Sequence, residues 1–280
     1  MPNYQGFCGP SNPSQSVQAD CERTINFYVE RVESPAAPTD AALYPTPGFE
    51  PFLSTTAVGA RSSIFSMAGR TFVVIGPGLY ELFAGGTSTL RGTVAQDNYP
   101  ATISYNGATG NELFVTSGTN GYTYDLGTNT LTLVLTGEAT MGGMINARFL
   151  AFNVANGRVR LSDLNDGLTW GATLYFERTL APDPWQAMLI APPDIWLIGE
   201  QTGEVWTDTG AFPQPFAPRP GAFFNWGTPA PFSAAVAGDS IVWLSKSAAG
   251  QGVIVGSRGY APQPISNYAV DTAIAAYARN

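Results

Sequence analysis

The chain has 280 residues, of which 44% are hydrophobic, and a formal net charge of −8, so it is long enough to bury a large core. It contains no histidine, which excludes histidine-ligated metals and the histidine-based machinery of nucleophilic catalysis. Lys246 is the single lysine and the arginines are scattered, whereas proteins that hold nucleic acid by its phosphates cluster their cations. We therefore expect no sequence-specific nucleic-acid binding.

Residues 1–44 differ in composition from the rest, and we predict an extended N-terminal arm there, followed by a main body at residues 45–280. Residues 20–30 alternate in character, which is typical of a strand. This strand either completes a sheet of the main body or docks on a neighbouring molecule, since such a segment gains order by burying itself on a partner. The side chains that we expect to make an assembly contact are Arg23, Asn26, Tyr28 and Glu30.

Both cysteines, Cys8 and Cys21, lie in the predicted arm. Two thiols with no histidine nearby cannot complete a four-ligand zinc site, and we expect free or loosely paired thiols in a reducing cytosol. We therefore predict no metal and no cofactor. The first residues lack the charged and apolar regions of a signal peptide, and no apolar run approaches the roughly 20 residues that span a bilayer, so we expect no membrane insertion.

From residue 61 onward, a short apolar strand recurs five times along the chain. The strands begin at Phe72, Leu113, Phe149, Ile195 and Ile241 and are spaced by 36 to 46 residues, close to the about 40 to 50 residues of a propeller blade. A smaller strand precedes each of them, and a Gly-containing turn with a hairpin partner follows. A fourth, weaker strand follows in places, as at residues 130–135.

This repetition predicts an all-β fold, a β-propeller of small antiparallel blades with five legible repeats. A β-sandwich whose strands are evenly spaced by accident is the competing interpretation. Residues 267–277 have the apolar spacing and the alanines of a short helix. A propeller usually closes by pairing its first and last strands, and no closing strand follows the fifth repeat. We expect either an unusual closure or a fragment of a longer chain, and we favour the fragment.

The turn at residues 163–170 resembles the Asp-box hairpin of sialidase-type propellers, Ser-x-Asp-x-Gly-x-Thr-Trp. Asp163 stands at the Ser position and Asn165 at the Asp position, so two positions depart from the pattern. Such boxes stabilise turns and are not catalytic, and we assign structural roles to Asp163, Asn165, Gly167 and Trp170. Three aspartates that end hairpin strands are expected to accept turn hydrogen bonds, with Ca²⁺ binding as the alternative: Asp125, Asp163 and Asp208.

Tryptophans recur within the repeats, and we predict that Trp196 and Trp206 pack inside blades. The alternative is a carbohydrate-binding platform. The turn at residues 200–203 joins two strands at the edge of a blade, so Glu200 and Gln201 are available for assembly contacts.

Several segments resemble, in their order and spacing, the tail-hub or packaged-DNA stabilisation family of short-tailed, P22-like bacteriophages. The two clearest are residues 158–170 (RVRLSDLNDGLTW) and 194–210 (DIWLIGEQTGEVWTDTG). Shorter similarities extend the match over most of the chain: residues 22–30, 47–49, 181–184, 221–223, 230–233, 243–244, 250–252 and 259–266.

The resemblance implies a structural virion protein and no enzyme: a tail hub that assembles as a ring, six copies of itself, below the portal and its adaptor. There it would anchor the tail needle, spikes or fibres and help to retain packaged DNA, after assembly in the host bacterial cytoplasm. An acidic channel would repel DNA, so retention would be steric. The alternatives are a ligand-binding propeller that recognises glycan or protein, and an enzyme that uses a carboxylate pair.

Overall fold

The computed structural model describes residues 25–31, 41–53, 63–178, 180–211, 214–246, 250 and 252–277. The chain divides into two compact units. The smaller consists of Met1–Pro51 with Ser266–Asn280, and the larger of Phe52–Ile265.

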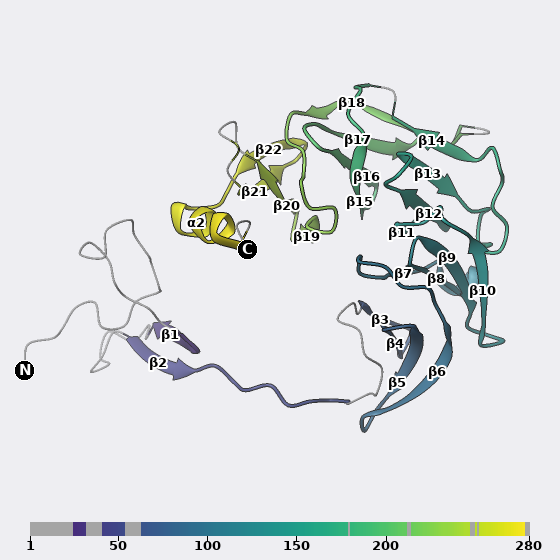
Figure 1. The fold of residues 1–280 in the computed structure, drawn as a ribbon, viewed down its shortest axis with the longest axis horizontal. Coiled ribbons are helices and arrows are strands. Elements are labelled where there is room, and N and C mark those ends of the chain that lie inside the picture. The colour runs from purple at the N-terminus through teal and green to yellow at the C-terminus, as the bar shows by residue number, and fades with distance from the viewer. Residues whose placement is uncertain are drawn as a thin grey trace, which may run out of the picture. The chain divides into compact units, whose positions relative to one another are not determined.

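The larger unit contains five four-stranded antiparallel sheets, each built from four strands that are consecutive in the chain (Figure 1). The first sheet contains β3 (Ser63–Met67), β4 (Arg70–Ile75), β5 (Gly78–Phe83) and β6 (Thr87–Thr93). The second contains β7 (Thr102–Tyr105), β8 (Glu112–Ser117), β9 (Asn120–Asp125) and β10 (Thr130–Leu135), with the one-turn helix α1 (Gly107–Gly110) between β7 and β8. The third contains β11 (Met141–Ile145), β12 (Arg148–Asn153), β13 (Arg158–Leu161) and β14 (Tyr175–Glu177). The fourth contains β15 (Trp185–Ala191), β16 (Asp194–Gly199), β17 (Gly203–Asp208) and β18 (Phe216–Phe224), and the fifth β19 (Ala235–Ala237), β20 (Ser240–Lys246), β21 (Gly252–Arg258) and β22 (Ala261–Pro264).

The sheets of the larger unit follow one another around an axis (Figure 1). The first strands of neighbouring sheets contact one another, β3 with β7, β7 with β11 and β11 with β15, while β6 meets β10 and β18 meets β22 at the opposite edges. Radial repetition of small sheets is the arrangement of a β-propeller, so the predicted all-β propeller with five repeats is confirmed and the sandwich is excluded. Among the described strands, no contact of that extent joins the fifth sheet to the first.

The five apolar strands predicted from the sequence are the second strands of the sheets, β4, β8, β12, β16 and β20. The fourth strands were predicted only in part, although all five sheets have one. They lie at sheet edges and are less buried, as the mostly exposed pattern of β6 shows. Both β18 and β22 contain prolines, which suppress a strand prediction but are tolerated at an edge, where one N–H needs no ladder partner.

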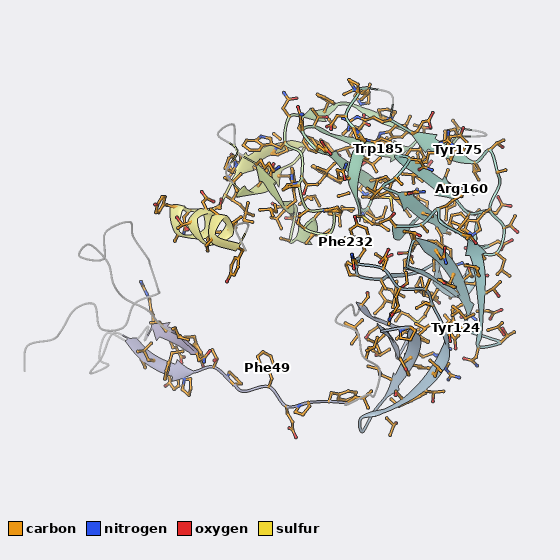
Figure 2. All side chains as sticks on the ribbon, in the orientation of Figure 1. Phe49, Tyr124, Arg160, Tyr175, Trp185 and Phe232 are labelled. Atoms are coloured by element: carbon orange, nitrogen blue, oxygen red, sulfur yellow. The ribbon has the colours of Figure 1, made fainter. Side chains whose placement is uncertain are left out.

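Aromatic side chains fill the space between successive sheets, and Figure 2 shows Tyr124 and Trp185 in these layers. Phe72 of β4 meets Tyr124 of β9 with ring centroids 5.4 Å apart, and Phe114 of β8 stacks on Phe149 of β12 at the same distance. All four of these side chains are buried. Each sheet therefore buries its apolar face against its neighbour, as in other repeat proteins, and no single sheet holds a core of its own.

The smaller unit contains a hairpin and a helix. Strand β1 (Phe27–Arg31) pairs antiparallel with β2 (Ala41–Pro45), and helix α2 spans Tyr268–Tyr277, as the sequence predicted for residues 267–277. The arm thus has two strands where one was predicted. The sequence does not predict strand β2, because the prolines at positions 45 and 47 indicate a turn. Pro45 is nevertheless the last residue of the strand, where the missing N–H costs little. No helix in the described part of the chain is long and apolar enough to cross a membrane.

Candidate functional surfaces

Four polar side chains join successive sheets at one end of the propeller. Arg70, Glu112 and Asp194 are the first residues of β4, β8 and β16, and Asn146 lies two residues before β12. Each reaches the last residue of the third strand of the following sheet or the turn that comes after that strand. Because the second strand starts beside the end of the third in an antiparallel sheet, all four links lie at the same end.

Arg70 links the first sheet to the second. Its Nη1 donates to the carbonyl oxygen of Leu126 at 3.0 Å and its Nη2 to Oδ1 of Asn129 at 2.9 Å. The same guanidinium holds the buried Glu81 carboxylate, with Nε 2.6 Å from Oε1, and Arg91 reaches Oε2 from the other side. The hydrogen bond from Arg70 lowers the pKa of Glu81 below its ordinary value, against the opposing effect of burial, and Arg91 adds to the lowering.

Glu112 links the second sheet to the third. Its Oε2 accepts the backbone N–H of Gly167 at 2.7 Å and Nδ2 of Asn106 at 2.8 Å, and all three groups are buried. Burial raises the pKa of the Glu112 carboxyl above its ordinary value, and the two hydrogen bonds oppose this only in part. A Cβ at position 167 would overlap the Phe149 ring and Thr123, so the turn approaches the sheet this closely only because the residue is glycine.

The remaining two links join the third sheet to the fourth and the fourth to the fifth. Nδ2 of Asn146 donates to Oδ2 of Asp208 at 2.7 Å. The buried Asp194 accepts the Tyr260 hydroxyl on Oδ2 at 2.6 Å and Arg219 on Oδ1 at 2.7 Å. The hydrogen bond to Asp194 raises the pKa of Tyr260, and burial raises it further. The polar groups of these loops thus serve the joints between blades.

The turn that resembles an Asp-box is part of the second of these joints. Trp170 donates its Nε1 to the carbonyl oxygen of Gly167 at 2.7 Å and lies against Phe114 of the preceding sheet with centroids 5.0 Å apart. Asp163 forms a backbone bridge with Asp166, and Asn165 adopts a left-handed conformation with φ of 55°.

The side-chain acceptor of that turn is Asp166, a position that the Asp-box pattern does not indicate. Its Oδ1 accepts the N–H groups two and three residues later, at 2.8 and 3.2 Å. Asp125 does the same in the second sheet, at 2.7 and 3.0 Å, and Asp208 accepts the N–H of Gly210 at 2.8 Å. The expected turn bonds are therefore confirmed for Asp125 and Asp208, whereas Asp166 makes them in place of Asp163. A threonine three residues after both Asp125 and Asp166 is the shared signal.

The two tryptophans of the fourth sheet are buried among other aromatic side chains. Trp196 faces the fifth sheet, 6.3 Å from Trp243 and stacked on Tyr260 at 6.0 Å. Trp206 stacks on Phe176 at 4.5 Å. Neither ring presents a free face, which matches packing roles and leaves no platform at these two positions.

The hairpin β1–β2 presents apolar side chains at its surface. Arg23 lies outside the described residues. Asn26 has φ of 59° and its carbonyl oxygen accepts both the N–H and the hydroxyl of Thr46, at 2.9 and 3.1 Å, which closes the hairpin end. Tyr28 stacks on Tyr44 at 5.8 Å yet is 49% exposed, and Glu30 is exposed.

The turn that contains Glu200 and Gln201 is exposed, and one carboxylate accepts hydrogen bonds from its backbone. Asp183 accepts the backbone N–H groups of Glu200, Gln201 and Thr202 at 3.0, 3.1 and 2.8 Å, and the Thr202 hydroxyl at 2.8 Å. Burial alone would raise the pKa of Asp183, but these hydrogen bonds together hold that pKa below its ordinary value. Asp183 therefore fixes the turn as an anion, and the two side chains above it line a cavity of about 800 Å³.

A second cavity, of about 390 Å³, lies between the first strands β7, β11 and β15. Met141, Met144 and Ile190 are among its lining residues, and Phe232 closes it from the segment that enters the fifth sheet. Phe232, labelled in Figure 2, packs on Tyr99 with centroids 5.4 Å apart. The segments that enter the second and fifth sheets therefore meet on the inner side of the propeller.

A sialidase-type site would need arginines gathered around one carboxylate, and the two described arginines considered for that role, Arg70 and Arg148, have separate partners. Arg61 lies outside the described residues, Arg70 is committed to Glu81, and Arg148 donates to the Ser162 carbonyl oxygen at 2.8 Å. Within the same residues, no three cysteine, aspartate or glutamate side chains are placed to hold a metal ion.

The fold and these contacts define a β-propeller in which polar and aromatic side chains join neighbouring blades. Residues 26–280 match the family described as bacteriophage P22 Gp10, beta-propeller. The chain belongs to this family of phage structural proteins, and the resemblance seen in the sequence is confirmed. No curated protein matches the sequence.

Solved structures with a similar backbone arrangement share little sequence with this chain. The N-terminal domain of Nup159 gives a TM-score of 0.43 at 10% identity, over 75% of this chain and 66% of that one. Hsv2 of Kluyvelomyces marxianus gives a TM-score of 0.36 at 8% identity, over 58% of this chain and 48% of that one. A functionally unknown protein of Desulfotomaculum acetoxidans DSM 771 gives a TM-score of 0.48 at 11% identity, over 74% of this chain and 68% of that one. The chain thus spans less than two thirds of the length of the first two.

Proposed function

We propose that this protein is a hub of the phage tail, assembled in the host cytoplasm, in which a ring of copies, six by the family resemblance, sits below the portal and its adaptor. There it helps to retain packaged DNA, anchors the needle, spikes or fibres of the tail, and has no enzymatic activity. Membership of the phage stabilisation family supports the virion role. The observation that carries the assembly proposal is the exposed apolar surface of the β1–β2 hairpin.

That hairpin has more apolar surface than it can cover by itself. Ile25 is 60% exposed, Phe27 and Tyr28 are each 49% exposed, and Tyr44 is 46% exposed. An isolated two-stranded hairpin is marginally stable in water, and full burial of one such side chain contributes about 1.5–3 kcal/mol. Docking on a second copy would therefore stabilise both the hairpin and the ring.

The arrangement of arginines supports steric retention of DNA over direct binding. Of the nine arginines in the described residues, six pair with carboxylates: Arg70, Arg91, Arg158, Arg160, Arg178 and Arg219. Cations that are already neutralised release few counterions from DNA, and counterion release dominates phosphate binding. A ring of such chains would hold the genome by closing the channel.

The test mixes the purified protein with the portal and adaptor of its own phage and measures mass by light scattering and shape by cryo-electron microscopy. Wild-type protein should form a ring on the adaptor. The double variant Phe27→Ser and Tyr28→Ser should lose assembly without a change in the thermal midpoint of the propeller. Leu133→Ser, which removes a half-exposed side chain from β10, is the matched control and should assemble. Monomeric wild-type protein in the presence of both partners would overturn the proposal.

A further inference from the structure

The cavity above the Glu200 turn has the size and lining of a ligand site. Its volume of about 800 Å³ falls in the range of roughly 300–1,000 Å³ that small-molecule sites occupy. It opens where the fourth and fifth sheets meet, at the end of the propeller away from the four polar links, because it follows the last residue of β16 and includes the last residue of β20. The side chains that carry the argument are Gln186, Glu200, Gln201, Asn225, Trp226 and Lys246.

Several polar groups of this lining have no partner within the described part of the protein. The side-chain amides of Gln201 and Asn225 make no hydrogen bond there, and Lys246 forms no ion pair there. Gln186 donates only a long bond of 3.4 Å to Glu200. Among the described residues, the cavity therefore has donors and acceptors that no other side chain or backbone group uses, and a ligand could bind to them.

The walls of the cavity are nevertheless fixed. Asp183 holds the Glu200 turn from below, and the N–H of Thr228 donates to the Gly199 carbonyl oxygen at 2.8 Å. The Gly227 carbonyl oxygen accepts the Ser245 hydroxyl at 2.6 Å. A Cβ at position 227 would overlap the backbone of Glu200, so the two walls are in close contact at that point. Rigid walls reduce the ordering cost of binding.

The chemistry of the lining matches a sugar. A side-chain amide presents a donor and an acceptor in one plane, which suits two neighbouring hydroxyl groups. The half-buried indole of Trp226 provides a flat apolar body for the C–H face of a pyranose ring. Clustered cations for nucleic acid are missing from the lining, and so is the long aliphatic wall that a lipid would need. Glu200 and Lys246 carry opposite charges, which favours an uncharged ligand.

We propose that this cavity binds a neutral saccharide, with Trp226 against a ring face and Asn225 and Gln201 on its hydroxyl groups. Bacterial surface polysaccharides are a source of such ligands that a virion meets. The proposal is separate from the tail-hub assignment, because ring assembly and saccharide binding are measured independently.

The experiment screens the full chain against an array of neutral hexose and N-acetylhexosamine oligomers, with uronic-acid oligomers as the charged arm, and measures the best binder by calorimetry. Wild-type protein should bind a neutral oligomer. Asn225→Ala and Gln201→Ala should each weaken the Kd by about threefold to tenfold, the loss expected for one hydrogen bond. Trp226→Ala should abolish binding, and Gln263→Ala, which removes an exposed amide from β22, should leave the Kd unchanged.

Trp226 also packs against the core of the fourth and fifth sheets, so its variant is interpreted only alongside a thermal melt. The exposed Asn225 and Gln201 avoid this problem and decide the result. Failure of every neutral oligomer to bind, or an unchanged Kd in both amide variants, would overturn the proposal. So would a change in oligomeric mass in Gln201→Ala without a change in Kd, because that result would assign the turn to assembly.

Discussion

Removal of the Glu112 carboxylate should loosen the joint between the second and third sheets. In Glu112→Ala, the Gly167 N–H and the Asn106 amide remain buried and lose an acceptor at 2.7 and 2.8 Å. A buried donor left without a partner costs about 1–3 kcal/mol, so for these two donors we expect a loss of about 2–6 kcal/mol in the free energy of unfolding. Glu112→Gln keeps an oxygen at this position and should cost about 1 kcal/mol or less.

The contribution of Glu112 to the free energy of unfolding depends on pH with a defined sign. Because burial raises the pKa of Glu112 in the folded protein, the folded state binds more protons than the unfolded state between the ordinary value of 4.5 and the raised pKa. The contribution of Glu112 is therefore fully present below 4.5 and is lost as the pH rises through the raised pKa. Glu112→Gln cannot titrate, so its stability should improve relative to wild type over the same interval.

Urea unfolding followed by tryptophan fluorescence provides the assay, since Trp170 bonds to Gly167 and contacts Phe114 at this joint. Asp125→Ala, which removes a carboxylate from an exposed turn, is the control and should cost less than Glu112→Ala. Equal midpoints for Glu112→Ala and Glu112→Gln would refute the reasoning, because they would show that the shared acceptor does not hold the joint.

Three further predictions concern other contacts of the propeller. Since Arg70 lowers the pKa of Glu81, the contribution of that carboxylate is present above 4.5 and is lost as the pH falls through the lowered pKa, so the thermal midpoint of wild type should drop more steeply in acid than that of Glu81→Gln; parallel profiles would contradict this. Gly227→Ala should lower the free energy of unfolding, measured in urea, by about 1–3 kcal/mol, because its Cβ overlaps the Glu200 backbone. An unchanged urea midpoint would show that the two walls of the cavity can move apart without cost. Tyr260→Phe should cost about 1 kcal/mol, because Asp194 keeps Arg219 but loses a hydroxyl at 2.6 Å; a loss larger than that of Asp194→Ala would argue against this account.

The sequence predicts the propeller because its strongest signal is repeated. Residues 72–75, 113–115, 149–152, 195–198 and 241–244 are short apolar runs at one period, and each is the buried second strand of a sheet. The edge strands are weaker because one side of each ladder is unpaired, so exposure and proline are tolerated there. Strand β2 shows the same effect, since its residues favour a turn until β1 pairs with them.

The joints between blades could not be read from the sequence in the same way. Glu112 and Gly167 are 55 residues apart, and Asp194 and Tyr260 are 66 apart, so nothing local indicates that each pair meets. The Asp-box comparison found the correct turn but placed its acidic position at Asn165, one residue before the acceptor Asp166. Asp183 stands between two prolines in a connection with no strand pattern, and only the folded chain brings it to the backbone of the Glu200 turn.

The polar links and the proposed saccharide cavity lie at opposite ends of the propeller, so the two can be tested separately. The links from Arg70, Glu112 and Asp194 lie where second strands begin, whereas the proposed saccharide cavity lies where β16 and β20 end. Variants at the links should therefore lower stability and leave the Kd of a saccharide unchanged as long as the fold persists. Variants of the cavity amides should change the Kd and leave stability unchanged, because those side chains have no partner in the described residues. These two independent outcomes are expected only if the propeller is a rigid scaffold, in which the joints between blades support the binding surface but contribute no contact to the ligand.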